Sequence, residues 1–147
     1  MSRAIVNAVK DRRRRVRLIA VVAAIGFVAL GLGIRAYAGP DGVAQYPATA
    51  LYASMIYASV LLVLPDIRAA VAGAAAITFC WLIEFLQLTG VPAALAERSV
   101  LARLVLGEQF DAVDLAWYAV GVLPLVVLHR ISDRRRPQPP DLAATSE

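Results

Sequence analysis

Four long apolar blocks constrain this chain more than any other feature of its sequence. They occupy residues 18–34, 47–64, 69–88 and 113–128, and the first two contain no charged residue. At about 1.5 Å per residue, helices of this length cross, or nearly cross, a hydrocarbon core about 30 Å thick. The chain is also 60% hydrophobic, above the roughly 45–50% typical of soluble domains. We therefore predict an all-α, polytopic membrane protein built as a bundle of four transmembrane helices.

The chain is expected to form a single domain. The membrane domain covers residues 18–128 and is preceded by a basic segment, residues 1–17. Residues 129–147 are rich in proline, charge and small polar residues, which predicts a disordered tail. No second domain is expected in either flanking segment.

The longest connection, residues 89–112, joins the third and fourth blocks. Gly90 and Pro92 are suited to end the third span and begin a short helix, because proline is tolerated in a first turn. Gly107 is suited to end that helix. Asp111 is placed to cap the fourth span.

The basic residues predict the orientation of the chain. Twelve of the 15 lysines and arginines lie before the first span, between the second and third, or after the fourth, and the other three are Arg35, Arg98 and Arg103. Because cytoplasmic segments retain lysine and arginine, both termini are predicted to be cytoplasmic and the long loop to lie outside. The basic N-terminus then faces anionic lipid, which explains it without nucleic acid as a partner.

A cleaved signal peptide is an alternative interpretation of the N-terminus. Basic residues, an apolar stretch and the small-residue triplet of residues 36–38 are its ordinary components. The first block exceeds the usual apolar length of such signals, and Arg35 precedes the triplet. Cleavage would leave three spans and would remove Arg35 from any site.

Two blocks carry polar residues that need an explanation. Trp81, Glu84 and Gln87 are spaced three apart and so share one face of the third span. The fourth span has a comparable face, formed by Asp114, Trp117, Tyr118 and Gly121. A carboxylate in lipid is costly, so Glu84 is expected to turn inward and find a partner. Arg35 and Arg98 are the expected partners.

These residues predict a polar cluster near the outer surface, with Arg35, Glu84, Gln87, Arg98 and Asp114 as candidate ligand-binding residues. A purely structural role stays open, because polar contacts between helices also stabilise membrane bundles. Asp114 has its own alternative role, since an acid in a first turn favours the helix dipole.

Other chemistries find little support in the sequence. Cys80 is the only cysteine and His129 the only histidine, and no phosphate-binding loop or zinc motif is present. We therefore expect no cofactor and no metal.

The segments "GLGIRAY", "FCWLIEFLQL" and "ERSVLARLVLGEQFDAVDLAWYAVG" resemble small bacterial membrane proteins of domain-of-unknown-function family 2809 (DUF2809), which are VanZ-like. The resemblance implies a four-helix inner-membrane protein, and by analogy with VanZ a role in the cell envelope. Family members often carry an acidic residue and a tryptophan before the second span. This chain has "AQYPATALYASM" there, so if that acid belongs to the family's site, either the site is altered in this chain or Asp41 substitutes.

Three functional classes remain. The first is a binding protein whose arginines receive an anionic lipid headgroup or cell-envelope precursor, since guanidinium groups match phosphate and carboxylate geometry. The second is an intramembrane enzyme in which Glu84 and Asp114 act as an acid and base pair. The third is a structural or assembly subunit. Membrane lipids are the expected partners, together with a possible second copy of the chain.

Overall fold

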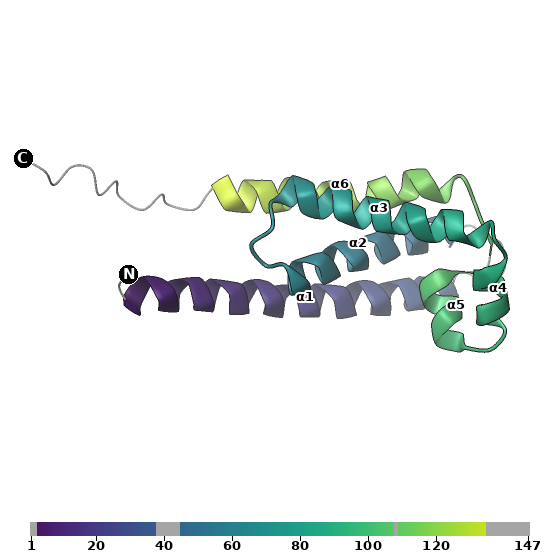
Figure 1. Cartoon of the computed structure of the whole chain (residues 1–147), viewed down its shortest axis with the longest axis horizontal. Coiled ribbons are helices and arrows are strands. Elements are labelled where there is room, and N and C mark those ends of the chain that lie inside the picture. Colours follow the sequence, from purple (N-terminus) through teal and green to yellow (C-terminus); the bar gives the residue numbers. More distant parts are fainter. Residues whose placement is uncertain (1–2, 38–44, 108, 135–147) are drawn as a thin grey trace, which may run out of the picture.

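The structure is a computed structural model that describes residues 3–37, 45–107 and 109–134. All regular elements in these ranges are helices (Figure 1). Their bounds are α1 Arg3–Tyr37, α2 Gln45–Val63, α3 Ala69–Gln87, α4 Val91–Ala96, α5 Val100–Leu106 and α6 Asp114–Arg134. Helices α1, α2, α3 and α6 are each long and apolar enough to cross a membrane. The prediction of an all-α protein with four membrane-spanning helices is confirmed.

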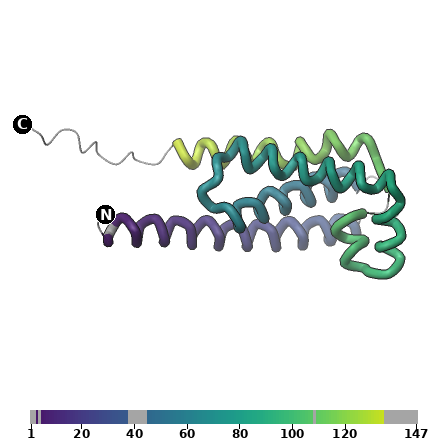
Figure 2. Tube along the Cα trace, viewed as in Figure 1, coloured from purple at the N-terminus to yellow at the C-terminus, as the bar shows by residue number. Residues whose placement is uncertain are grey.

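The four long helices run alongside one another and form a bundle with two distinct ends (Figures 1 and 2). Helices α4 and α5, residues 91–106, form a hairpin at one end, which we call the hairpin end. The turn between α2 and α3, residues 64–68, lies at the opposite end with the start of α1 and the end of α6, and we call this the turn end. The assignment of the turn end to the cytoplasm stays a prediction from charge.

The boundaries of α2 and α3 follow the apolar blocks closely, whereas α1 begins well before its block and α6 ends after its block. Helices α2 and α3 differ from their predicted spans by no more than two residues at any end. Helix α6 continues to Arg134, so the expected disordered tail is wrong for residues 129–134. These residues include no glycine or proline, so nothing local ends the helix where the apolar block ends. Residues 135–147 and Asp41 lie outside the described residues.

Helices α2, α3 and α6 form the packed core. Its buried residues are mostly small: Ala53, Ala72, Ala76, Cys80 and Val122 are fully buried. The closest approach is between α2 and α6, where a Cβ on Gly121 would overlap the carbonyl oxygen of Ala50. The Ser54 hydroxyl donates to the Gly121 carbonyl at 3.0 Å, so the two helices are also joined by a hydrogen bond.

Helix α1 is the peripheral helix. Among the described helices it packs against α2 alone. At about 1.5 Å per residue its 35 residues measure about 52 Å, well beyond the roughly 30 Å of a hydrocarbon core. The basic N-terminal part of α1 therefore continues the helix beyond the apolar block.

Candidate functional site

Glu84 lies in the last turn of α3 and is only 1% exposed. Its Oε1 accepts a hydrogen bond from the backbone N–H of Asp111 at 2.6 Å. Its Oε2 accepts a hydrogen bond from the Tyr118 hydroxyl, also at 2.6 Å. A buried carboxylate needs such donors because it has left the water that would otherwise solvate it. We call Glu84, Asp111 and Tyr118 the Glu84 clamp, since together they join α3, the loop before α6, and α6.

Gln87, one turn further along α3, holds the end of the hairpin. Its Nε2 donates to the Leu106 carbonyl at 2.7 Å. The next residue, Gly107, has φ +68° and ψ −172°, a conformation that is essentially restricted to glycine. A Cβ at Gly107 would also lie 2.6 Å from Gln87 Nε2. Glycine is thus required there both by the backbone and by the close approach of Gln87. The Oε1 of Gln87 is buried and has no hydrogen-bond partner among the described residues.

Asp111 links the clamp to the start of α6 and to α2. Its Oδ1 accepts from the Val113 N–H at 2.9 Å, and its Oδ2 accepts from Gln45 Nε2 at 3.3 Å. Because Val113 precedes the first residue of α6, Asp111 closes the turn that leads into the helix and does not cap an N–H within it, so the prediction of a cap is wrong. Two further bonds fasten this end of the bundle: the Tyr52 hydroxyl donates to the Val105 carbonyl at 2.8 Å, and Trp81 Nε1 donates to the Leu115 carbonyl at 3.2 Å.

Asp114 is the first residue of α6 and is 8% exposed. The polar side chains of Thr49 and Gln45, both on α2, lie near its carboxylate. Its Oδ1 is buried and accepts no hydrogen bond from the part of the chain that the structure describes. A negative group at this position also interacts favourably with the positive end of the helix dipole, as the sequence indicated.

The two arginines expected beside Glu84 are elsewhere. Arg35, in the last turn of α1, and Arg98, in the turn between α4 and α5, are both exposed. Neither forms an ion pair with Glu84 in the described part of the chain, so the expected pairing is wrong. The physical reason is that a backbone N–H and a phenol already donate one hydrogen bond to each oxygen of Glu84. In addition, the backbone of α1 packs against that of α2 alone among the described helices, so Arg35 is not placed beside α3.

The predicted cluster therefore separates into two groups. Glu84, Gln87 and Asp114 are buried or half-buried inside the hairpin end, whereas Arg35 and Arg98 are on its surface. Arg103, the third arginine of this end, reaches back with Nη2 to the Ala96 carbonyl at 3.3 Å and so joins α5 to α4.

Residues 38–122 match the family model described as "Protein of unknown function (DUF2809)". This range covers more than half of the chain. The chain belongs to the DUF2809 family. The matched region of this DUF2809 protein contains the whole Glu84 clamp, Gln87, Gly107 and Arg98, while Arg35 lies just before it. No solved structure matches the chain.

Sequence reasoning missed the partners of Glu84. Tyr118 is on the same predicted helical face as Asp114 but was not among the expected partners of Glu84. The spacing of Asp114 and Tyr118, together with the need of Glu84 for a donor, was the available signal. The other partner, a backbone N–H, leaves no mark in the sequence.

A second polar network lies at the turn end of the DUF2809 bundle. The hydroxyl of Tyr57, which is 3% exposed, forms a 2.8 Å hydrogen bond with His129 Nδ1. His129 Nε2 lies 3.4 Å from Asp133 Oδ2. Asp66, in the α2–α3 turn, pairs with Arg12 Nη1 at 3.0 Å and with Arg13 Nε at 2.6 Å. His129 thus joins α2 to α6, a role that its position in the sequence did not indicate.

Proposed function

We propose that this DUF2809 protein is a non-enzymatic inner-membrane protein whose hairpin end binds an anionic lipid headgroup or cell-envelope precursor. Arg35 and Arg98 are the proposed contacts to the anion. Glu84, Gln87 and Asp114 serve as the framework that holds the hairpin in place. The observation that carries the proposal is the difference in pairing between the acidic and basic groups of this end.

Two acidic groups of this end, Glu84 and Asp111, are engaged inside the protein, whereas Glu97 is exposed and Asp114 is buried. Both oxygens of Glu84 accept hydrogen bonds from Asp111 and Tyr118, and both oxygens of Asp111 accept bonds from Val113 and Gln45. By contrast, Arg35 and Arg98 are exposed and have no carboxylate partner among the described residues. Guanidinium groups bind phosphate and carboxylate in a bidentate manner, so these two residues suit an anionic headgroup.

The hairpin has the surface expected of a segment at the membrane interface. Val100 and Leu101 are 72% and 70% exposed, and Val91 is 51% exposed. Short helices that combine exposed apolar and basic side chains lie favourably between headgroups and acyl chains. The positive-inside distribution supports an outer-leaflet position for this end, and thereby an envelope lipid as the anion.

A structural role is the second candidate, and one observation favours it. Glu84 is only 1% exposed and both of its oxygens are held by the protein, as a residue that only fixes helices would be. The acid–base alternative for Glu84 and Asp114 lacks such support, because a substrate would first have to displace the donors from Glu84.

Native mass spectrometry of the full chain in mild detergent tests the proposal. The wild type is compared with Arg35→Gln/Arg98→Gln and with the control Arg130→Gln/Arg134→Gln, which removes two exposed charges from the turn end. We expect the wild type and the control to retain one anionic lipid more than the first variant does. The same spectra record oligomeric state.

Equal retention by all three proteins would contradict the binding proposal and leave the structural role. Because Arg35 and Arg98 take part in no ion pair with another described residue, the double variant is expected to fold. A thermal melt followed by circular dichroism verifies this.

A further inference from the structure

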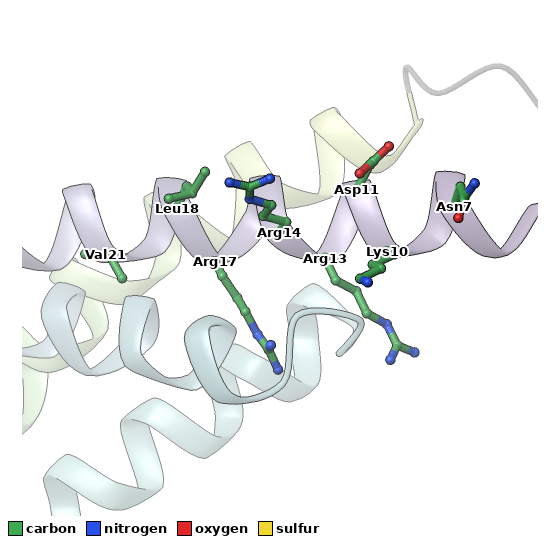
Figure 3. Close-up of a pocket in the computed structure, with 8 residues that line it drawn as sticks. All are labelled: Asn7, Lys10, Asp11, Arg13, Arg14, Arg17, Leu18 and Val21. Atoms are coloured by element: carbon green, nitrogen blue, oxygen red, sulfur yellow. The ribbon is translucent and has the colours of Figure 1, made fainter.

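The basic part of α1 forms an open surface groove at the turn end, and all the residues that line it belong to α1 itself. Its volume is about 850 Å³, and its lining includes Lys10, Asp11, Arg13, Arg14 and Arg17 (Figure 3). Four cationic side chains thus accompany a single acid. Positions 10, 14 and 17 are one helical turn apart in succession, so these positions follow one side of α1 over about 10 Å, from which the Arg14 and Arg17 side chains extend in different directions.

The internal contacts of the groove leave most of this charge available. Arg13 is engaged, because its Nε pairs with Asp66 at 2.6 Å. Lys10 and Arg14 are exposed and have no carboxylate partner among the described residues. After Arg13 is set aside, three cations face one acid, Asp11.

Arg17 is held in position without losing its charge. Its Nε donates to the Leu62 carbonyl at 3.2 Å, at the end of α2. This bond occupies one nitrogen of the guanidinium and directs the side chain toward α2, as Figure 3 shows. A guanidinium fixed in this way loses less side-chain entropy when it binds an anion.

Apolar side chains follow the cations directly. Leu18 and Val21 line the same groove and are 58% and 37% exposed. The backbone of α1 packs only against that of α2 among the described helices, so the exposed part of this apolar surface has no other helix of the described chain beside it. From Lys10 to Val21, the groove presents positive charge first and hydrocarbon next, the order in which a phospholipid presents its phosphate and its acyl chains.

We propose that this groove is a binding site for one anionic phospholipid. Its phosphate contacts Lys10, Arg14 and Arg17, and an acyl chain lies on Leu18 and Val21. The site is separate from the hairpin end and does not depend on the function proposed there. It goes beyond a general attraction of the basic N-terminus to the membrane, since it requires particular side chains on one side of α1.

The test is a titration of the full chain in micelles with phosphatidylglycerol or phosphatidylcholine, with bound lipid counted by native mass spectrometry. The variant is Lys10→Gln/Arg14→Gln. The control, Arg130→Gln/Arg134→Gln, removes two exposed charges from α6 at the same end of the bundle. We expect the wild type to prefer phosphatidylglycerol, the variant to bind it roughly 10- to 30-fold more weakly, and the control to match the wild type.

Equal weakening by the control would show that only the total charge matters and would overturn the proposal. Equal binding of the two lipids by the wild type, or unchanged affinity in the Lys10→Gln/Arg14→Gln variant, would also overturn it. The Arg35→Gln/Arg98→Gln variant separates the two sites. This variant is expected to keep the lipid at α1. If the hairpin proposal fails, Arg35→Gln/Arg98→Gln binds as much lipid as the wild type. If the α1 proposal fails, Lys10→Gln/Arg14→Gln does.

Discussion

Replacing Tyr118 by phenylalanine removes one hydroxyl from the Glu84 clamp and leaves the ring in place. The lost bond, at 2.6 Å, has the length of a hydrogen bond between a hydroxyl and a charged carboxylate. Glu84 is 1% exposed, so water cannot readily replace the donor. Hydrogen bonds to charged groups contribute about 1.5–3 kcal/mol, above the average of about 0.6 kcal/mol for polar contacts between membrane helices. We expect Tyr118→Phe to lower the free energy of unfolding by about 1.5–3 kcal/mol.

Unfolding by titration with sodium dodecyl sulfate in mixed micelles, followed by circular dichroism, measures this change. Tyr46→Phe is the matched control, because Tyr46 stacks on Trp117 with ring centroids 5.7 Å apart and phenylalanine keeps that stacking. We expect the control to change the free energy of unfolding by less than about 0.5 kcal/mol. If Tyr118→Phe were no more destabilising than Tyr46→Phe, the reasoning that Glu84 depends on this donor would be refuted.

Four glycine substitutions, two tests each with its own control, are compared by the same measurement of the free energy of unfolding. Gly107→Ala is expected to cost about 2–4 kcal/mol, because alanine is strained at this φ and ψ and its Cβ approaches Gln87. Gly90→Ala, at φ +74° with open space around it, is expected to lower the free energy of unfolding by only about 1–2 kcal/mol. If Gly90→Ala and Gly107→Ala lowered it equally, a contribution from the contact with Gln87 would be excluded. Gly121→Ala is expected to cost at least about 2 kcal/mol, because its Cβ would overlap a backbone carbonyl of α2. Gly33→Ala, with no atom within 4 Å, is expected to be neutral or slightly stabilising, and equal effects of these two would contradict the close approach of α2 and α6.

Part of the candidate site was predictable from helical spacing. Trp81, Glu84 and Gln87 were assigned to one face of the third span, and each makes a hydrogen bond to a segment beyond α3. The inward orientation of Glu84 was also predictable, since an ionisable group in an apolar helix seldom faces lipid. These inferences hold because the positions of side chains around a helix follow from its fixed geometry.

The pairing of Glu84 was not predictable in the same way. Opposite charge suggested Arg35 and Arg98 as partners, but the structure provides the N–H of Asp111 and the hydroxyl of Tyr118. Opposite charge indicates which groups attract each other, whereas the packing of the helices determines which groups are close enough to interact. A backbone donor has no signature in the sequence, because every residue except proline has one.

Length and hydrophobicity determined by themselves that the chain has four membrane-spanning helices, since each span satisfies its own backbone hydrogen bonds and only its length must match the bilayer. The sequence also determined where α5 ends, at Gly107. Only the tertiary structure decided that α1 packs on α2 alone, that Glu84 is held by Tyr118, and that the arginines stay on the surface. These features depend on how each helix is rotated and shifted against its neighbours, which is set by side chains far apart in the chain.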